Sequence, residues 1–386
     1  MPLLAFLITR LGIAGVAYFA APILADSTVP PYHMRPDNTL IDVFASRWDT
    51  GFYIEIADQG YRVQGAQFPS VAFFPLLPVL MRLARLLTGD TLVAGLLVAN
   101  LSLLAAVMML HIFTAEEFDQ PTADRAVWYL LIFPASFFGS AVYSESLYLL
   151  LGIAALYLAR KNRWWAAGGV SVLAAMTRFV GILLAPMLIA EWLQRRKQPR
   201  DEPSTGEEMA PAVIRRPLEW PDLIAASLAP IGTLGYMLYL MRNFGDALAF
   251  LHASDAWGRT PATLLKTLAE LAAQPPQGWL RALADGALPL DNWLDLLFVL
   301  TFIVLGAILL AQKRWSEGVF VVLGAVTPFS SGLLMSQRRY MWVLFPAFIL
   351  LARWGKHTWV DRVIFVVSLL LLGLFTAMFA NWYWVG

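Results

Sequence analysis

The sequence predicts an all-α polytopic membrane protein, a bundle of about eleven transmembrane helices with an interfacial helix in an outer loop after the first span. Only 14% of the 386 residues are charged, against roughly 25% in soluble domains. Apolar stretches of about 14 to 22 residues recur along the chain, so the hydrophobicity lies in repeated segments rather than in one core. The distribution of Lys and Arg then gives these segments an orientation.

Eleven apolar segments are predicted to cross the membrane. They are residues 3–24, 92–113, 126–142, 144–160, 164–177, 179–194, 222–242, 292–312, 317–334, 340–353 and 361–380. Several are shorter than the roughly 20 residues that a bilayer requires. Short spans are tolerable where neighbouring helices enclose a water-filled cavity.

The positive-inside rule orients the chain with its N-terminus in the cytoplasm. In that orientation more than half of the 28 basic residues fall in cytoplasmic loops, most of them short. Another apolar stretch, 71–88, would reverse the side of every later loop if it crossed the membrane. It carries Arg82 and Arg85 among leucines and two prolines, so we predict an amphipathic helix lying on the outer interface.

A single transmembrane domain is predicted for residues 1–386. Residues 25–91 form its first outer loop, 195–221 a charged, proline-rich cytoplasmic linker, and 243–291 a second outer loop with helical pieces broken at Pro275, Pro276 and Pro289. A cleaved signal peptide ending at Ala25 is an alternative for the first segment. The lack of a basic start and the presence of Arg10 in the apolar run disfavour it.

Composition also narrows the set of ligands. A net charge of +1 offers no basic surface for nucleic acid. Cysteine is absent, which excludes disulfides and thiolate metal sites. The four histidines, His33, His111, His252 and His357, are isolated in the sequence. We therefore predict no resident metal or cofactor, while a divalent cation at Asp49 and Glu145 is left open.

Five polar clusters fall at the predicted outer ends of the helices, where we expect the protein to work. They are Arg47-Trp48-Asp49, Phe74-Pro75, Tyr143-Ser144-Glu145-Ser146, Thr177-Arg178 and Arg338-Arg339-Tyr340. In the segment 46–61, a helical period of 100° places Asp49 and Tyr53 on one face. Aromatic surface from Trp48 and Tyr53 would shield the carboxylate and hold a sugar ring. The alternative is an interfacial helix with a solvated aspartate.

The outer arginines need an explanation because the positive-inside rule disfavours them there. Arg178 lies between two apolar stretches and requires a partner or an anion if it is buried. Arg338 and Arg339 precede an apolar run, and a lipid phosphate would explain them. Salt bridges to Glu145 or Asp49 are the structural alternative. Glu145 itself could complement a helix dipole, and Tyr143 and Tyr340 could belong to an interfacial aromatic belt.

These motifs together resemble a known family. The segments WDTGFYIEIADQGY, AFFPLLP, FPASFFGSAVYSESLYLL, TRFVGILLAPMLI and RRYMWVLFP occur in the order found in the PIG-V mannosyltransferases. Those enzymes belong to the GT-C superfamily of membrane glycosyltransferases, which use polyprenyl-phosphate-linked sugars. The likeness runs from about residue 3 to 353 and is weaker over 195–290. It implies a GT-C-like bundle with its active site on the extracytoplasmic face.

The resemblance also implies roles for particular residues. The acidic catalytic position falls on Asp49, and the arginine positions fall on Arg178 and Arg339. The aromatic-proline element falls on Phe73, Phe74 and Pro75, and the Tyr-Ser-Glu element on Tyr143, Ser144 and Glu145. The chain has Arg-Phe-Val-Gly at 178–181 where the eukaryotic members are expected to have Arg-Ser-Asn-Gly. It is also short, so we expect a prokaryotic, plasma-membrane member whose acceptor need not be a GPI anchor.

The expected reaction is inverting transfer of a hexose, most simply mannose, from a polyprenyl phosphate to a hydroxyl of a lipid-linked or glycan acceptor. Asp49 would be the general base, and Arg178, Arg338 and Arg339 would bind the donor phosphate. The other candidate substrate-binding residues are Arg47, Trp48, Tyr53, Phe74, Pro75, Tyr143, Glu145 and Tyr340. A transporter or flippase of a lipid-linked sugar is the alternative, although no repeat is evident. A membrane scaffold would give Asp49 and the outer arginines no reason to converge.

Overall fold

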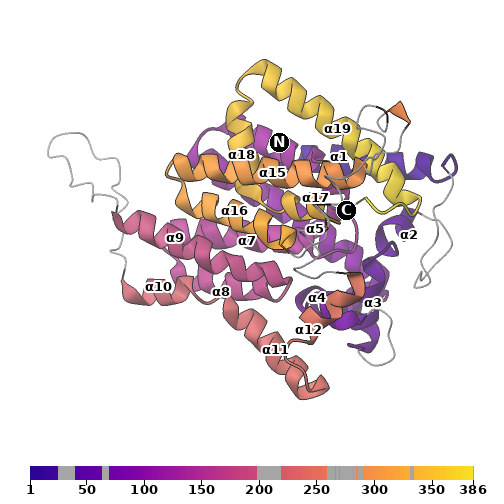
Figure 1. Ribbon diagram of the computed structural model, residues 1–386, viewed down its shortest axis with the longest axis horizontal. Coiled ribbons are helices and arrows are strands. Elements are labelled where there is room, and N and C mark those ends of the chain that lie inside the picture. Colours follow the sequence, from indigo (N-terminus) through magenta and orange to yellow (C-terminus); the bar gives the residue numbers. More distant parts are fainter. Residues whose placement is uncertain are drawn as a thin grey trace.

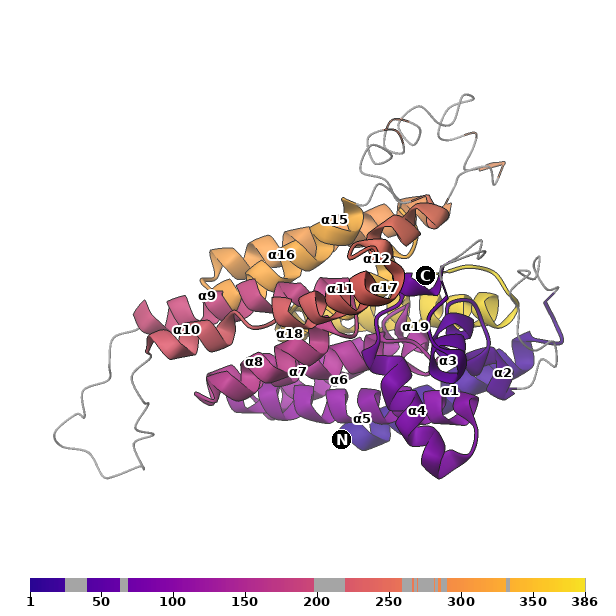
Figure 2. The same cartoon turned by 90° about the horizontal axis from the view of Figure 1, so that it is seen from below.

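The computed structural model describes residues 1–24, 40–62, 69–197, 219–258, 290–330 and 334–385, with a few isolated positions between 258 and 290. Within these residues the chain is helical and has no strand, and its long helices pack side by side (Figures 1 and 2). The elements are α1 (Pro2–Ala20), α2 (Leu40–Ala45), α3 (Thr50–Gln59), η1 (Ser70–Ala72), α4 (Leu76–Thr88), α5 (Thr91–Glu117), α6 (Gln120–Ile132), η2 (Ser136–Gly139), α7 (Glu145–Arg160), α8 (Trp164–Ala175), η3 (Phe179–Leu183), α9 (Leu184–Lys197), α10 (Trp220–Ala226), α11 (Pro230–Phe244), α12 (Ala249–Ala253), η4 (Ser254–Trp257), α15 (Leu290–Ala311), α16 (Trp315–Phe329), α17 (Gln337–Trp342), α18 (Phe345–Trp354) and α19 (Thr358–Ala380).

Each of the eleven predicted apolar segments overlaps at least one of these helices. Four of the described helices, α1, α5, α15 and α19, are long and apolar enough to cross a membrane by themselves. A fifth span results if α10 and α11, which are bent by 49° at a short break, count as one. An all-α membrane protein is therefore supported, and the count of eleven spans stays a prediction.

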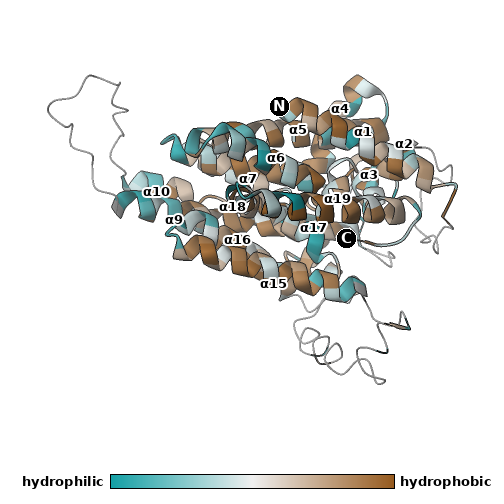
Figure 3. Ribbon diagram, turned by 90° about the horizontal axis from the view of Figure 1, so that it is seen from above, coloured by the Kyte–Doolittle hydropathy of each residue, from teal (hydrophilic) through white to brown (hydrophobic). Residues whose placement is uncertain are grey.

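The outward surface of the bundle is apolar. Large hydrophobic side chains on α1 and α19 point away from the core, and Leu11 and Leu370 are 71% and 69% exposed. Hydrophobic residues also dominate α15 and α16 (Figure 3). Soluble proteins rarely expose contiguous apolar surface on this scale. These faces are suited to lipid.

The predicted spans 126–142, 222–242 and 340–353 are each divided between two helices separated by a short gap. The segment 126–142 ends its helix at Ile132, just before Pro134, and continues as the short η2. Proline cannot donate a backbone hydrogen bond, so carbonyls at such a break need other partners. Trp342 Nε1 donates to the carbonyl of Leu130 at 2.9 Å, and the Arg10 guanidinium donates to the carbonyls of Leu131 at 3.0 Å and Ser136 at 2.8 Å. The arginine that interrupts the first apolar run thus pairs with two of the carbonyls at this break.

The first outer segment gathers α2, α3 and α4 at one end of the bundle, with α12 close by (Figures 1 and 2). In α4, Arg82 donates from Nε to the carbonyl of Ala57 at 2.8 Å, and Arg85 pairs with Asp58 at 2.8 Å. These cations complement the C-terminal end of α3. Leu86, on the other side of α4, is 82% exposed. The helix is amphipathic as expected, and its position on a membrane surface stays a prediction.

The C-terminal end of α7, at Arg160, carries a network of ion pairs. Arg160 contacts Glu117, Glu191 and Glu317, and Arg314 contacts Glu117 and Glu317. The network joins the ends of α5, α7, α9 and α16. Glu317 and Glu191 are almost fully buried, so these charges depend on their partners.

Several predicted features lie outside the described residues. These are most of the linker 195–221, most of the second outer loop 243–291 with Pro275, Pro276 and Pro289, the segment 25–39 of the first outer loop, and His33.

Candidate active site

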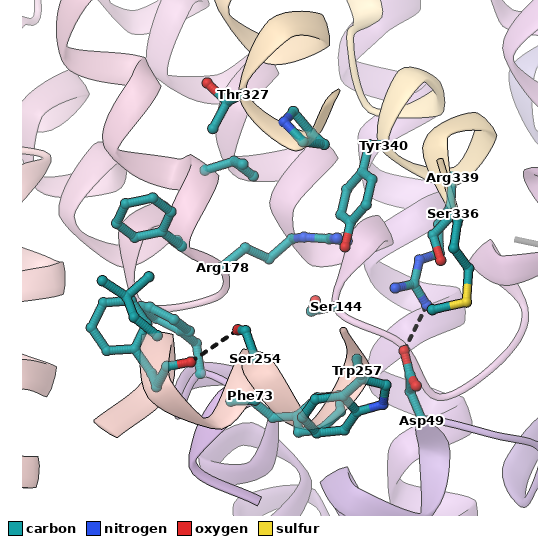
Figure 4. Close-up of a pocket in the computed structure, with 18 of the residues that line it drawn as sticks. Asp49, Phe73, Ser144, Arg178, Ser254, Trp257, Thr327, Ser336, Arg339 and Tyr340 are labelled. Carbon is teal, nitrogen blue, oxygen red and sulfur yellow. Dashed lines mark hydrogen bonds and ion pairs between the residues drawn. The ribbon is translucent and has the colours of Figure 1, made fainter. Parts of the chain in front are cut away.

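A cavity of about 620 Å³ lies where α3, α7, η3, α12 and α17 meet (Figure 4). Its lining combines residues far apart in the sequence, from the first outer segment to the segment after α19. Among the residues that line it are Asp49, Tyr53, Phe73, Phe74, Ser144, Glu145, Thr177, Arg178, Phe250, Trp257, Ser336, Arg339, Tyr340 and Trp384. Residues from all five predicted polar clusters thus line one cavity.

Asp49 lies at the start of α3, and a hydrogen bond of its backbone N–H holds it in place. Its N–H donates to the phenolic oxygen of Tyr143 at 3.2 Å, and that hydroxyl donates to the carbonyl of Arg47 at 3.3 Å. The preceding residue, Trp48, has a φ of 56°, in the left-handed region that bulky residues rarely adopt. This turn directs the Asp49 side chain into the cavity.

Two arginines and two carboxylates form a chain of ion pairs across the cavity wall. Arg339 Nη1 lies 2.7 Å from Asp49 Oδ2, and Arg339 Nε lies 3.1 Å from Glu145 Oε1. Arg178 contacts the same oxygen of Glu145. The Glu145 side chain is only 1% exposed and that of Arg339 7%. The cluster is neutral overall, which offsets part of the cost of burying four charges.

Aromatic rings surround the guanidinium of Arg339. Its Cζ lies 5.3 Å from the ring centroid of Tyr143 and 5.5 Å from those of Tyr340 and Trp384. Phe138 adds a fourth ring at 5.4 Å, and Arg178 lies 4.9 Å from the ring of Tyr340. Cations within about 6 Å of a ring centroid are attracted to its π face. The rings therefore fix the guanidinium without using its hydrogen-bond donors.

The opposite wall of the cavity is aromatic. Phe73 and Trp257 lie together beside Asp49 in Figure 4, with ring centroids 6.0 Å apart. Phe74 packs against Phe250 at 5.4 Å. The cavity thus has a charged side and an aromatic side, as a site for a charged amphipathic ligand would.

Tyr53 joins the two sides of the cavity. Its hydroxyl donates to the Ser144 hydroxyl at 3.0 Å. Burial, followed by the nearby charge of Glu145, raises the pKa of Tyr53 above its ordinary value. The phenol therefore stays protonated and able to donate at neutral pH.

The salt bridges considered as an alternative reason for the outer arginines are present, because Arg339 contacts both Asp49 and Glu145. They do not remove the cations from the cavity, since Arg178 and Arg339 both line it. Glu145 is also the first residue of α7, so its charge complements that helix dipole. The same arrangement is therefore compatible with ion pairs that stabilise the fold and with cations that bind a ligand.

Arg338 is not brought to the cavity. Its side chain is fully buried, with Nε 2.7 Å from Asp295 Oδ1 and a second contact to Asp291. Consecutive residues of a helix point about 100° apart. Because Arg339 of α17 faces the cavity, Arg338 faces α15 instead.

Four other predicted residues support the cavity from outside its lining. Arg47 lies with its Cζ 4.3 Å from the Trp382 ring and donates to the carbonyl of Ala380 at 3.3 Å. Trp48 packs against Trp384, and Tyr143 holds the backbone of Asp49. Pro75 lies at the N-terminal end of α4. None of the four is among the lining residues.

The sequence reasoning missed Phe250, Trp257 and Trp384. Phe250 and Trp257 belong to the second outer loop, and Trp384 follows α19. In the sequence, Phe250 and Trp257 are isolated, and only the run Trp382-Tyr383-Trp384 is locally rich in aromatic residues. It could not be distinguished from an interfacial belt, which uses the same residue types.

Asp49 and Glu145, suggested above for a divalent cation, both contact the Arg339 guanidinium. The Arg339 guanidinium therefore occupies the space between the two carboxylates. Among the residues that the structure describes, no group of three His, Asp or Glu side chains gathers as a metal site would need.

Comparison with known proteins identifies the relatives of one part of the chain. Residues 20–196 match the family described as Mannosyltransferase (PIG-V), which confirms the resemblance over that stretch. GPI mannosyltransferase 2 of Cryptococcus neoformans is 31% identical over 150 residues, covering 36% of this chain and 34% of the relative. GPI alpha-1,6-mannosyltransferase 2 of Mus musculus is 31% identical over 155 residues, covering 37% and 31%. The matched part spans about a third of these curated relatives.

Among solved structures, the chain aligns with the oligosaccharyltransferase AglB of Archaeoglobus fulgidus in complex with an inhibitory peptide and a dolichol-phosphate. The alignment has 13% identity and a TM-score of 0.44, and covers 100% of this chain and 56% of that one. The apo form of the Archaeoglobus fulgidus oligosaccharyltransferase gives 13% identity and a TM-score of 0.45, with 99% and 56% covered.

Proposed function

We propose that this chain, whose residues 20–196 match the PIG-V mannosyltransferase family, is a membrane mannosyltransferase. It transfers mannose with inversion from a polyprenyl-phosphate donor to a hydroxyl of a lipid-linked or glycan acceptor. One observation carries the proposal. The chain of ion pairs from Asp49 through Arg339 and Glu145 to Arg178 puts a candidate base and two cations in one cavity.

The two cations suit the donor phosphate. Arg178 and Arg339 are joined by Glu145, so a phosphate in the cavity could accept from both guanidiniums. Such charge-assisted bonds strengthen as negative charge develops on the departing phosphate. A polyprenyl phosphate is already a stable anion near neutral pH, so its departure needs little help from a general acid. One carboxylate can then suffice, unlike in glycoside hydrolysis.

Asp49 acts as the base in this proposal. Its carboxylate takes the proton of the acceptor hydroxyl, whose oxygen forms a bond to the anomeric carbon. The bond between that carbon and the phosphate oxygen breaks at the same time, and polyprenyl phosphate leaves with the electron pair. Attack from the face opposite the leaving group inverts the anomeric centre. Arg339, which contacts Asp49, is common to both ends of the reaction.

The aromatic side of the cavity suits the sugar. Phe73 and Trp257 present ring surface beside Asp49 (Figure 4), and such surface buries the apolar face of a sugar ring. Phe179 and Leu251 line the cavity and are partly exposed, so they offer apolar surface for the start of a prenyl chain. The acceptor then approaches from the Asp49 side.

The same proposal includes the membrane topology. Eleven spans with a cytoplasmic N-terminus would place the cavity on the extracytoplasmic face of a prokaryotic plasma membrane. The support is the charge distribution of the loops. Labelling of single cysteines placed on each side of the membrane tests it, because the chain has no cysteine of its own.

The decisive experiment uses the purified full chain in lipid nanodiscs. Radiolabelled polyprenyl-phosphate-mannose and a membrane lipid extract are added, and label in new products is measured. We expect transfer by the unchanged protein and none above background with Asp49→Asn. No transfer under any acceptor condition would contradict the proposal. A flippase would instead move the labelled lipid across a vesicle bilayer without forming a product.

A further inference from the structure

The segment 381–385, which follows α19, lies across the Arg47-Trp48-Asp49 motif. Arg47 stacks on the ring of Trp382 and donates to the carbonyl of Ala380. Trp48 packs against Trp382, with ring centroids 5.8 Å apart, and against Trp384 at 5.1 Å. Nearly the whole chain separates the two segments in sequence. Their contact is specific to the folded protein.

Two of these tryptophans have an unusual backbone. Trp48 has a φ of 56° and Trp382 a φ of 62°. The left-handed region is sparsely populated by bulky residues, and holding a residue there costs free energy that the surrounding contacts must offset. Both take part in the same ring contact, and Trp48 directly precedes Asp49. Strained residues tend to cluster at functional sites, because the surrounding structure must hold them in place.

Trp384 is the member of this segment that reaches the cavity. It lines the cavity, and the Cζ of Arg339 lies 5.5 Å from its ring centroid. Its Nε1 is buried and has no hydrogen-bond partner among the residues that the structure describes. The ring is therefore oriented by contacts of its faces and edges, with Arg339 and Trp48, and not by a hydrogen bond.

We propose that Trp384 is a positioning residue of the active site, which holds the Arg339 guanidinium through its π face and Trp48 through edge packing. By these two contacts it sets the relative position of Arg339 and Asp49. The inference rests on the proposed function, in which Arg339 binds the donor phosphate. It predicts that the aromatic character of residue 384 affects donor binding, beyond any effect on folding.

The test compares two substitutions of similar apolar bulk. Trp384→Phe keeps a π face, whereas Trp384→Leu removes it. We expect Trp384→Leu to raise the KM for the polyprenyl-phosphate donor about tenfold, the scale of a desolvated cation–π contact. Trp384→Phe should restore the donor KM to within about threefold of the unchanged protein. The KM for the acceptor should change little in either variant.

The matched control is Tyr383→Leu, which alters an exposed neighbour that does not line the cavity. A substitution that only destabilises the fold lowers the amount of active enzyme, and so the maximal rate, without changing KM. An unchanged donor KM in Trp384→Leu, or an equal rise in Trp384→Phe or Tyr383→Leu, would overturn the inference. If Trp384→Leu does not fold, a donor KM raised at least about threefold in Trp384→His, whose ring is weaker in cation–π contact, carries the same test.

Failure of this inference can be told from failure of the proposed function. If the proposed function fails, the unchanged protein transfers no mannose. If only the inference fails, the unchanged protein is active and the donor KM does not depend on the aromatic ring at position 384.

Discussion

Arg339 Nη1 lies 2.7 Å from Asp49 Oδ2, although 290 positions separate the two residues in the chain. The guanidinium also contacts Glu145 at 3.1 Å. It thereby links the first outer segment to α7 and α17.

Asp49→Asn should leave a folded protein whose transfer rate is lower by at least about a hundredfold, the scale of a lost general base. Asparagine keeps the size of the side chain but cannot accept a proton. Initial rates at saturating donor measure the effect. Glu55→Gln is the control, since Glu55 lies on the same helix and pairs outside the cavity with Arg62. Near-normal turnover in Asp49→Asn would remove Asp49 from its proposed role.

Arg339→Lys should raise the donor KM at least about tenfold while the protein stays folded. Lysine keeps the positive charge but lacks the planar fork that contacts Asp49 and Glu145 together. Titration of donor in the transfer assay gives the KM. Arg242→Lys, on the exposed surface of α11, should behave like the unchanged protein. If the donor KM of Arg339→Lys were unchanged, this arginine would be structural only.

Tyr53→Phe should reduce transfer by less than about tenfold, as expected for one neutral hydrogen bond. It should not alter the alkaline side of the pH profile. Burial, followed by the charge of Glu145, raises the pKa of Tyr53 above its ordinary value of 10.0. Because its pKa is raised, the phenol of Tyr53 stays protonated at least up to pH 10, so its ionisation cannot cause a loss of activity on the alkaline side below that pH. An alkaline limb that disappears in Tyr53→Phe would contradict this assignment.

Arg160→Ala should destabilise the protein by about 3–5 kcal/mol, because it leaves buried carboxylates without their main partner. Glu317 and Glu191 are the residues affected. The adjacent Lys161 pairs with Glu116 on the surface, with both side chains nearly half exposed. Lys161→Ala should therefore cost less than about 1 kcal/mol. Thermal unfolding of the two variants in the same detergent measures the difference, and equal unfolding temperatures would show that the network is dispensable.

The helical segments were predictable because apolar periodicity and length report directly on burial in a bilayer. The breaks within these helical segments were harder to predict. A proline marks the break after Ile132, but nothing local to that segment indicates that Arg10, more than 120 positions away, satisfies the exposed carbonyls.

The candidate site was predictable where a residue type is rare in its setting. Asp49, Arg178 and Arg339 are charges at the ends of apolar segments, and all three reach the cavity. Arg338 could not be separated from Arg339 without knowing the rotation of α17, which only the packed structure fixes. Trp257 and Trp384 are uncharged, and tryptophans are common at membrane interfaces, so nothing in the sequence distinguishes these two from the others.

The ion-pair network at the far end of α7 has a mechanical consequence. Glu145 begins α7 in the cavity and Arg160 ends it in the network, about 22 Å away at the rise of an α-helix. Ion pairs cross-link four helices at the Arg160 end, whereas at the Glu145 end α7 borders the cavity and is held by the ion pairs of Glu145 with Arg178 and Arg339. We therefore expect any tilting of α7, α9 and α16 that admits a lipid to pivot near Arg160, away from the cavity. Small rotations there become larger displacements at the cavity mouth.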